Sequence, residues 1–149
     1  MAESSDKVAI KPGAPTDQEL LVDLYSAVDW THYAEDPRRL MAAIEGADFV
    51  VSAMVGDSLV GLARCVSDDV SIVYIQDILV RPEHQGKGVG KSLVRAILER
   101  YCHVRQKVLL TDTRPEQLHF YGSLGFKNTR ELKEMPLNAF VMRDGMTLK

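Results

Sequence analysis

A glycine-rich segment near the middle of the chain has the residue types of a phosphate-binding loop. It reads HQGKGVGKSLV over residues 84–94. Three glycines stand at alternate positions and two lysines lie among them: Gly86, Gly88, Gly90, Lys87 and Lys91. Without Cβ atoms, such a loop lets backbone N–H groups approach phosphate oxygens, and a helix N-terminus adds about half a positive charge. The lysines can meet peripheral phosphate charge. The spacing therefore predicts a pyrophosphate cradle at the start of a helix.

Two known nucleotide-binding patterns come close to this segment, and both are incomplete. The G-x-x-x-x-G-K-[ST] loop of nucleotide hydrolases would end at Gly90-Lys91-Ser92, but Gln85 stands where its first glycine belongs. The dinucleotide fingerprint G-x-G-x-x-G would need a third glycine in place of Lys91. The residues RPEHQ also separate the glycines from the preceding strand, whereas a hydrolase loop begins as its strand ends. A nucleotide hydrolase is the less favoured alternative.

The elements around the loop predict a mixed α/β (α+β) fold. The chain has 149 residues with 46% apolar side chains, enough for one core, so we expect a single domain over residues 8–149 after a flexible N-terminus at residues 1–7. Periodicity and end signals predict helices over 16–28, 38–47, 89–101 and 115–125, and strands over 8–10, 48–55, 59–67, 71–80, 107–111 and 138–144.

Local signals specify several of the predicted boundaries. Thr16 and Glu19 have the spacing of a capping box, and Asp36 followed by Pro37 is typical of a helix start. The dipeptides Gly56-Asp57 and Asp68-Asp69 predict tight turns between three consecutive strands. These three strands should form an antiparallel meander ahead of the glycine-rich loop.

Two motifs in this order make the chain resemble the GNAT acetyltransferases. The segment DILVRPEHQGKGVGKSLV is similar to their motif A, an apolar strand followed by Q/R-x-x-G-x-G/A at a helix start, here Gln85 to Gly90. The segment HFYGSLGFKN is similar to their motif B, through Phe120, Tyr121, Gly125 and Phe126. The resemblance covers roughly residues 8–143. It implies a bent mixed sheet of about six to seven strands flanked by about four helices, with the fourth and fifth strands splayed to admit acetyl-CoA.

The resemblance also implies which residues bind the cofactor. The backbone of Ile78, Leu79 and Val80 would pair with the pantetheine arm and polarise the thioester carbonyl, and N–H groups of the loop would hold the pyrophosphate. Thr113 stands near the position of an asparagine that contacts pantetheine in many members. The implied cofactor-binding residues are Ile78, Leu79, Val80, Gln85, Gly86, Lys87, Gly88, Val89, Gly90, Lys91, Ser92 and Thr113. The acetyl group would then pass directly from acetyl-CoA to a primary amine.

Acid and base candidates follow from the same resemblance. Tyr121 stands where the family often has the proton donor to the departing CoA thiolate. Asp77 and Asp112 are candidate bases, acting directly or through water. Each has a structural alternative: Tyr121 could only pack, Asp77 could organise a buried hydrogen-bond network, and Asp112 could cap the helix after Pro115.

The segment AVDWTHYAED, residues 27–36, corresponds to a part of the family that commonly lines the acceptor side. Trp30 and Tyr33 offer aromatic faces, and three carboxylates accompany them. This combination suits a small primary amine such as an arylalkylamine or a polyamine, although Trp30 could equally be a core anchor. A CoA-binding regulatory module without transferase activity stays the main alternative.

Composition bears on the remaining partners. The net charge is −3 and the lysines and arginines are dispersed, so we expect no nucleic-acid partner. No apolar run could span a membrane, and the start MAESSDKVAI lacks the order of a signal peptide, which favours the cytoplasm. The histidines and cysteines lack metal-ligand spacing, so no metal is expected. A monomer or a homodimer is compatible with the sequence.

Overall fold

The computed structural model describes residues 7–143, which group into two compact units that divide after Leu110. All of the strands belong to the first unit. The flexible segment expected at residues 1–7 lies, apart from Lys7, outside the described residues. The expectation of a single domain stays a prediction.

A five-stranded mixed sheet forms the centre of the first unit. Its strands follow one another in the order β1-β2-β3-β4-β5, and the first four are antiparallel to their neighbours while β5 runs parallel to β4. The strands are β1 (Ala9–Pro12), β2 (Phe49–Val55), β3 (Ser58–Ser67), β4 (Ile72–Val80) and β5 (Gln106–Leu109). The mixed α/β fold and the meander of β2, β3 and β4 are thereby confirmed.

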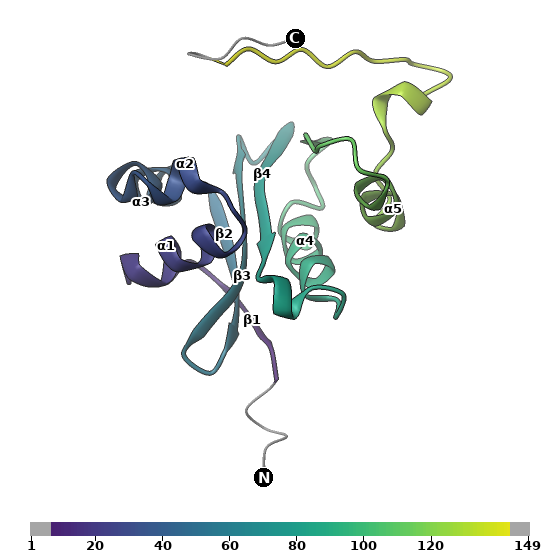
Figure 1. Ribbon diagram of the computed structural model, residues 1–149. Coiled ribbons are helices and arrows are strands. Elements are labelled where there is room, and N and C mark those ends of the chain that lie inside the picture. The colour runs from purple at the N-terminus through teal and green to yellow at the C-terminus, as the bar shows by residue number, and fades with distance from the viewer. Residues whose placement is uncertain (1–6, 144–149) are drawn as a thin grey trace. The chain divides into compact units, whose positions relative to one another are not determined.

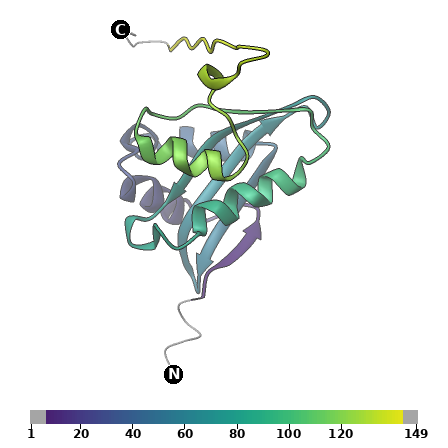
Figure 2. The same ribbon diagram turned by 90° about the vertical axis from the view of Figure 1, so that its right-hand side faces the viewer.

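Helices cover both faces of this sheet. Figure 1 shows α1 (Gln18–Ala27), α2 (Thr31–Ala34) and α3 (Pro37–Gly46) on one face and α4 (Val89–Arg100) on the other. Figure 2 shows α4 lying across the strands, in agreement with its contacts to β2, β3 and β4. The chain runs from the end of β4 through the glycine-rich loop into α4.

The start of α1 differs from the predicted capping box. Asp17 is the N-cap, and its side chain accepts a hydrogen bond of 2.9 Å from the backbone N–H of Glu19. Thr16 lies one residue too early, and the carboxylate directly before the first helical residue is also a strong acceptor for a helix N-terminus. The predicted start of α3 is confirmed, since Asp36 accepts from the backbone N–H of Arg39 at 3.2 Å and Pro37 is the first helical residue.

The two sheet faces bury separate apolar side chains. Toward α1 and α3, the core contains Leu21, Leu24, Tyr25, Leu40, Ile44, Leu59, Leu62 and Leu79. On the opposite face, α4 buries Val89, Leu93, Val94 and Ile97, as the helical spacing predicted. A Cβ added to Gly61 on β3 would lie 3.1 Å from Leu93 Cδ1, so α4 packs closely on the sheet at this glycine.

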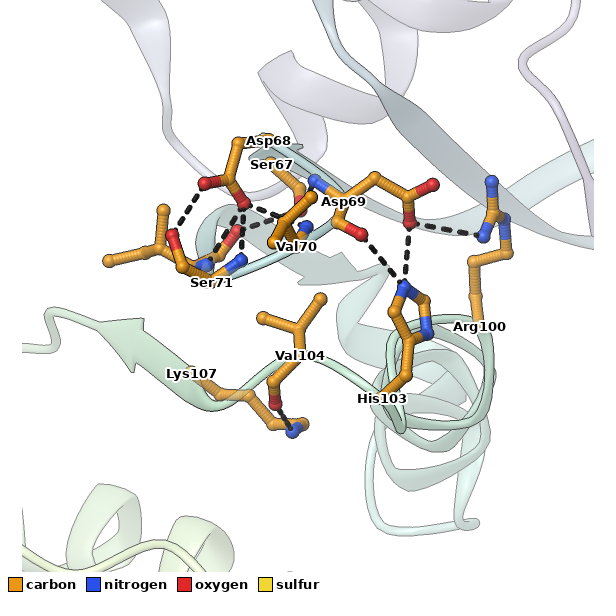
Figure 3. Close-up of polar contacts among 10 residues, drawn as sticks. Ser67, Asp68, Asp69, Val70, Ser71, Arg100, His103, Val104 and Lys107 are labelled. Atoms are coloured by element: carbon orange, nitrogen blue, oxygen red, sulfur yellow. Dashed lines mark hydrogen bonds and ion pairs between the residues drawn. The ribbon is translucent and has the colours of Figure 1, made fainter.

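The β3–β4 turn is tied to the C-terminal end of α4 (Figure 3). Asp68 closes the turn by accepting a hydrogen bond of 2.7 Å from the backbone N–H of Ser71. The Nε2 atom of His103 lies 2.9 Å from Oδ1 of Asp69, and an Arg100 nitrogen lies 3.6 Å from the same oxygen. These contacts fix the end of the sheet at which β4 and β5 begin to pair.

The second unit contains α5 (Pro115–Ser123) and the 3-10 turn η3 (Thr129–Glu131). As predicted, the chain leaves α5 through Gly125, which has a φ of 96°. The strand predicted over 138–144 is wrong within the described residues 138–143, which pair with no strand. Phe140 and Met142 are 93% and 90% exposed, so the apolar pattern of this segment has neither a hydrogen-bonded neighbour nor a core to face.

The counts of elements differ slightly from expectation. The described residues contain five strands instead of the expected six or seven, because the terminal segment is not a strand. They contain five α-helices instead of about four, because the short α2 forms inside the connection between the two predicted helices. Within residues 7–143, no helix combines the length and the apolar character needed to cross a bilayer.

Candidate active site

The strand β4 loses one of its two neighbours halfway along its length. Its parallel pairing with β5 runs from Ile72 opposite Gln106 to Ile75 opposite Leu109 and extends no further. The register with β3 shifts at the same place, because Cys65 faces Ile75 while Arg64 faces Asp77. Gln76 is therefore a bulge, which bends and twists a strand. The pairing of β4 with β5 ends directly before this residue, in the region where the resemblance predicts that the two strands splay.

Beyond the bulge, the backbone edge of β4 on the side of β5 pairs with no strand among residues 7–143. This part of the strand contains Ile78, Leu79 and Val80, the residues predicted to bind pantetheine. The side chain of Leu79 is buried in the core against α1. Its backbone groups lie along the strand edge, where a ligand can pair with them. Free strand edges bind extended chains through main-chain hydrogen bonds. The edge fits a pantetheine arm, which carries amide groups.

The glycine-rich loop is held directly at the end of this edge. The side chain of Gln85 donates a hydrogen bond of 2.9 Å from Nε2 to the carbonyl of Val80, which ties the loop to the strand. Gly86 and Gly88 have φ angles of 75° and 85°, in the left-handed region that favours glycine. A Cβ added at either glycine would meet no protein atom within 4 Å. The loop therefore leaves open space above its backbone.

The helix that follows the loop has an uncapped N-terminus. Gly88 is the N-cap of α4 and has no side chain to accept from the first helical N–H groups. The backbone N–H of Ser92 donates to Gly88 at 3.1 Å, so the N–H groups before it have no partner inside the helix. Gly90 lies in this first turn instead of in the loop. Open space, free donors and the helix dipole together fit a diphosphate.

A small hollow adjoins the loop. It has a volume of about 100 Å³ and is lined by Val8, Ile10, Lys87, Gly88, Val89 and Ser92. Ile10 of β1 and Val8, which directly precedes this strand, thus place two apolar residues beside the predicted phosphate-binding backbone. Lys87 is exposed at this hollow, where its ammonium group can reach a charged ligand.

Asp77 lies in a buried hydrogen-bond network on the α1 face of the sheet. It is 1% exposed, and its Oδ2 accepts from Tyr25 Oη at 2.9 Å and from Arg64 Nε. Arg64 Nη2 in turn donates to Tyr33 Oη at 3.0 Å. Burial, together with the charge of Asp77, raises the pKa of the Tyr25 hydroxyl, so Tyr25 stays a donor to this carboxylate. The structural role considered for Asp77 is therefore present.

Trp30 and Tyr33 both pack onto the same network. Their ring centroids lie 5.9 and 5.3 Å from that of Tyr25, in edge-to-face arrangements. Trp30 is partly buried against the core, so it is an anchor whatever else it does. The structure thus brings the two predicted acceptor residues together with Asp77. Sequence reasoning missed Tyr25 and Arg64, although a lone arginine in the apolar strand LVGLARCVS was an available signal.

In the second unit, Tyr121 is packed between two other aromatic rings. Its ring centroid lies 4.9 Å from that of Phe120 and 5.9 Å from that of Phe126, with nearly perpendicular planes. Burial, with a smaller contribution from the charge of Asp112, raises the pKa of Tyr121 to about 12. Tyr121 is therefore protonated at neutral pH and could donate a proton.

Asp112 is exposed and paired with Arg114. It accepts from the backbone N–H of Arg114 at 3.0 Å and forms an ion pair with its guanidinium at 2.9 Å, and these contacts lower its pKa to about 2. The expectation that Asp112 caps α5 is wrong, because Arg114 occupies the cap position and no side chain accepts there. Thr113 is exposed beside these residues. Within residues 7–143, no three potential metal-ligand side chains gather at one point.

Residues 14–141 match the family model of the acetyltransferase (GNAT) domain. Because the match covers most of the chain, the protein belongs to the GNAT acetyltransferases, a family of acyltransferase enzymes. The resemblance noted in the two sequence motifs is thereby confirmed.

Individual relatives agree with this assignment. The chain is 31% identical over 114 residues to an uncharacterized N-acetyltransferase, ycf52, of Gracilaria tenuistipitata var. liui, covering 71% of this chain and 61% of that protein. The GNAT family protein SP0256 of Streptococcus pneumoniae TIGR4 superposes with a TM-score of 0.75 and 30% identity, covering 93% of this chain and all 100% of that one. The chain spans between 27% and 64% of the length of the curated relatives that it matches.

A further solved structure shares the fold at lower identity. AAC(6')-Iy, in complex with the bisubstrate analog CoA-S-monomethyl-acetylneamine, superposes with a TM-score of 0.70 at 18% identity and covers 93% of this chain and 99% of that one.

Proposed function

We propose that this protein transfers the acetyl group of acetyl-CoA directly to the primary amine of a small molecule. One observation carries the proposal. The unpaired edge of β4 beyond Gln76 ends at a glycine-lined, uncapped helix N-terminus, so one continuous backbone surface offers donors for an amide-containing arm and for a diphosphate. The fold likeness to a protein solved with a CoA-containing bisubstrate analog supports acetyl-CoA as the donor.

The residues of β4 and the loop would bind and orient the donor. Bound acetyl-CoA supplies an activated acyl carbon. The backbone of Ile78, Leu79 and Val80 would hold the pantetheine arm, and an N–H of this edge would polarise the thioester carbonyl. The N–H groups from Gln85 to Ser92 would bind the diphosphate, and Thr113 would contribute a hydroxyl to the arm. Fixing both ends of the donor would position its acyl carbon for attack by an amine.

Tyr121 is the proposed proton donor to the sulfur that leaves. As the amine nitrogen bonds to the acyl carbon and the carbon–sulfur bond breaks, the thiolate needs a proton to become a stable product. The raised pKa of Tyr121, about 12, keeps its hydroxyl protonated at neutral pH, where it can supply that proton.

Asp77 is the proposed base, acting through water. Its Oδ2 already accepts two hydrogen bonds, but no donor among the described residues bonds to Oδ1. A water there could take the proton that the amine loses. Asp112 is the weaker candidate, because a carboxylate with a pKa of about 2 is a poor proton acceptor.

The acceptor is proposed to approach from the side of α1 and α2. Tyr33 and Trp30 form the aromatic part of this side. Tyr33 accepts from Arg64, which also donates to Asp77 of β4, and the Trp30 ring centroid lies 6.4 Å from that of Tyr33. A small arylalkylamine would place its ring on these faces and its amine toward the strand edge. The absence of a nucleic-acid, membrane or metal partner, the oligomeric state and a cytoplasmic location stay predictions.

The proposal is tested by ligand-induced stabilisation followed by a transfer assay. Acetyl-CoA should raise the melting temperature, since a ligand at a hundred times its Kd stabilises by about 2.7 kcal/mol, whereas ATP with Mg²⁺ should not. A panel of small amines and lysine peptides is then assayed by free-thiol release, with Trp30→Ala as the acceptor variant. Binding without transfer to any amine would favour the regulatory module, and transfer only to peptides would contradict the small acceptor.

A further inference from the structure

We propose that Arg64 recognises the acceptor, through a hydrogen bond from its Nη1 to a neutral oxygen close to the reacting amine. This inference rests on the proposed function and narrows it. The acceptor would be an amine whose neighbouring carbon carries a carboxamide, rather than a plain arylalkylamine or a polyamine.

The guanidinium of Arg64 is almost completely buried and held from two sides. Its side chain is 9% exposed. Nε donates to Asp77, and Nη2 donates to Tyr33 Oη at 3.0 Å. The guanidinium carbon also lies 5.7 Å from the centroid of the Tyr33 ring. A side chain fixed in this way has lost its rotamer freedom before any ligand arrives, so a further hydrogen bond costs little additional entropy.

The third guanidinium nitrogen of Arg64, Nη1, is available to a ligand. Nη1 of Arg64 donates to no atom of residues 7–143. The side chain as a whole is 9% exposed, so part of it reaches solvent, and Nη1 is the nitrogen that no described residue occupies. Arg64 thus presents one donor to solvent from a site that is otherwise closed around it.

The position of Arg64 places this donor near the reacting atoms. Arg64 lies opposite Asp77 in the β3–β4 register, and Asp77 directly precedes Ile78, the first residue of the free strand edge. Tyr33, which accepts from Nη2, belongs to the proposed acceptor side. A group bonded to Nη1 would therefore lie next to the proposed base Asp77 and the proposed acceptor side.

The charges around Arg64 favour a neutral oxygen. Asp77 already neutralises the guanidinium, and the connection that contains Tyr33 carries Asp29, Glu35 and Asp36. An acceptor carboxylate would meet this negative surplus, whereas a carbonyl would accept the hydrogen bond without the repulsion.

The test compares the binding of three matched amines to the protein saturated with CoA. Phenethylamine, phenylalaninamide and phenylalanine share one aromatic body and differ in having no oxygen, a carboxamide or a carboxylate. Their Kd values are measured by calorimetry, so no turnover is needed. We expect phenylalaninamide to bind roughly tenfold or more tightly than both others, as one hydrogen bond from a charged donor implies.

Variants then assign the preference to Arg64. Arg64→Lys keeps the positive charge but replaces the three guanidinium nitrogens by one ammonium nitrogen, which cannot reach Asp77, Tyr33 and the acceptor in the same geometry. It should bring phenethylamine and phenylalaninamide to within about twofold of each other. Tyr33→Phe leaves Nη1 in place and should retain the preference even if all three amines bind less tightly. If Arg64→Lys does not fold, the paired change Arg64→Met with Asp77→Asn removes both buried charges and should give the same loss of preference.

Three results would overturn the inference: equal binding of the amines to the unmodified protein, tighter binding of phenylalanine than of phenylalaninamide, or an unchanged preference in a folded Arg64 variant. The proposed function is judged separately, by acetyl transfer. If binding is amide-selective and depends on Arg64 but no acetyl transfer is detected, the proposed transferase activity is refuted and the recognition by Arg64 is supported. If acetyl transfer is detected but the amines bind equally, the transferase activity is supported and the recognition by Arg64 is refuted.

Discussion

Arg64 donates from its Nε to Oδ2 of Asp77 across β3 and β4, at the register position next to the bulge at Gln76. The same carboxylate oxygen accepts from Tyr25 of α1, so the pair joins the sheet to the helix layer that covers it. Because this happens where β5 stops pairing, the buried pair supports β4 at the place where the strand has only one neighbour.

Removal of one partner of this pair should destabilise the protein strongly. Asp77→Ala leaves the Arg64 guanidinium buried without its counter-charge, and we expect the free energy of unfolding to fall by roughly 3–5 kcal/mol, measured by urea denaturation. Asp23→Ala is the matched control. It breaks the ion pair with Arg81, in which the Asp23 side chain is 68% exposed, and should cost at most about 1 kcal/mol. Equal losses in the two variants would contradict a structural role for the buried pair.

Replacement of Gly88 by valine should weaken CoA binding strongly while the protein still folds. The new side chain would enter the open space above the loop backbone, so the Kd for CoA should rise roughly tenfold or more. The left-handed φ of 85° adds strain, which Gly56→Val reproduces at a φ of 57° in the β2–β3 turn. Both variants should melt at lower temperature, but only Gly88→Val should lose CoA in a calorimetric titration. Unchanged affinity in folded Gly88→Val would refute the phosphate site.

Tyr121→Phe should lower kcat and leave the KM for acetyl-CoA nearly unchanged. The change keeps the packed ring and removes the proton donor, so a loss of roughly a hundredfold is expected. Since the pKa of Tyr121 is raised to about 12, its hydroxyl stays protonated below that pH, and no limb of the pH–rate profile between about pH 6 and 10 should disappear in the variant. Tyr101→Phe, at a buried tyrosine that follows α4, is the control and should keep kcat. An unaltered kcat in Tyr121→Phe would reduce this residue to a packing role.

Asp77→Asn and Asp112→Asn should separate the two candidate bases. Asp77→Asn keeps the shape of the side chain, and kcat should fall roughly a hundredfold near neutral pH. The deficit should shrink as the pH rises, because the amine then loses its proton without help. Asp112→Asn should change kcat little, since the pKa of Asp112 is already lowered to about 2 by Arg114 and this carboxylate is a weak base. The reverse ranking of the two variants would move the base to Asp112.

Features encoded within a few neighbouring residues could be predicted from the sequence alone. The Asp36-Pro37 start of α3, the Gly125 exit from α5 and the turns of the meander are confirmed, because the backbone angles and caps they need depend on adjacent residues. Gly86 and Gly88 have left-handed φ angles, whereas Gly90 lies in the first turn of α4. The two motifs, being local as well, were sufficient to indicate the acetyltransferase family that the whole-chain match confirms.

Features that depend on partners distant in the sequence were decided by the tertiary structure. Arg64 and Asp77 pair across strands and Tyr25 reaches them from α1, so no spacing rule could connect these three. The apolar pattern of residues 138–144 predicted a strand. A strand forms only where a neighbour supplies backbone hydrogen bonds, and residues 138–143 have no such neighbour among the described residues. Local backbone geometry thus determined the glycine-rich loop, and long-range pairing determined where β4 loses its neighbour β5.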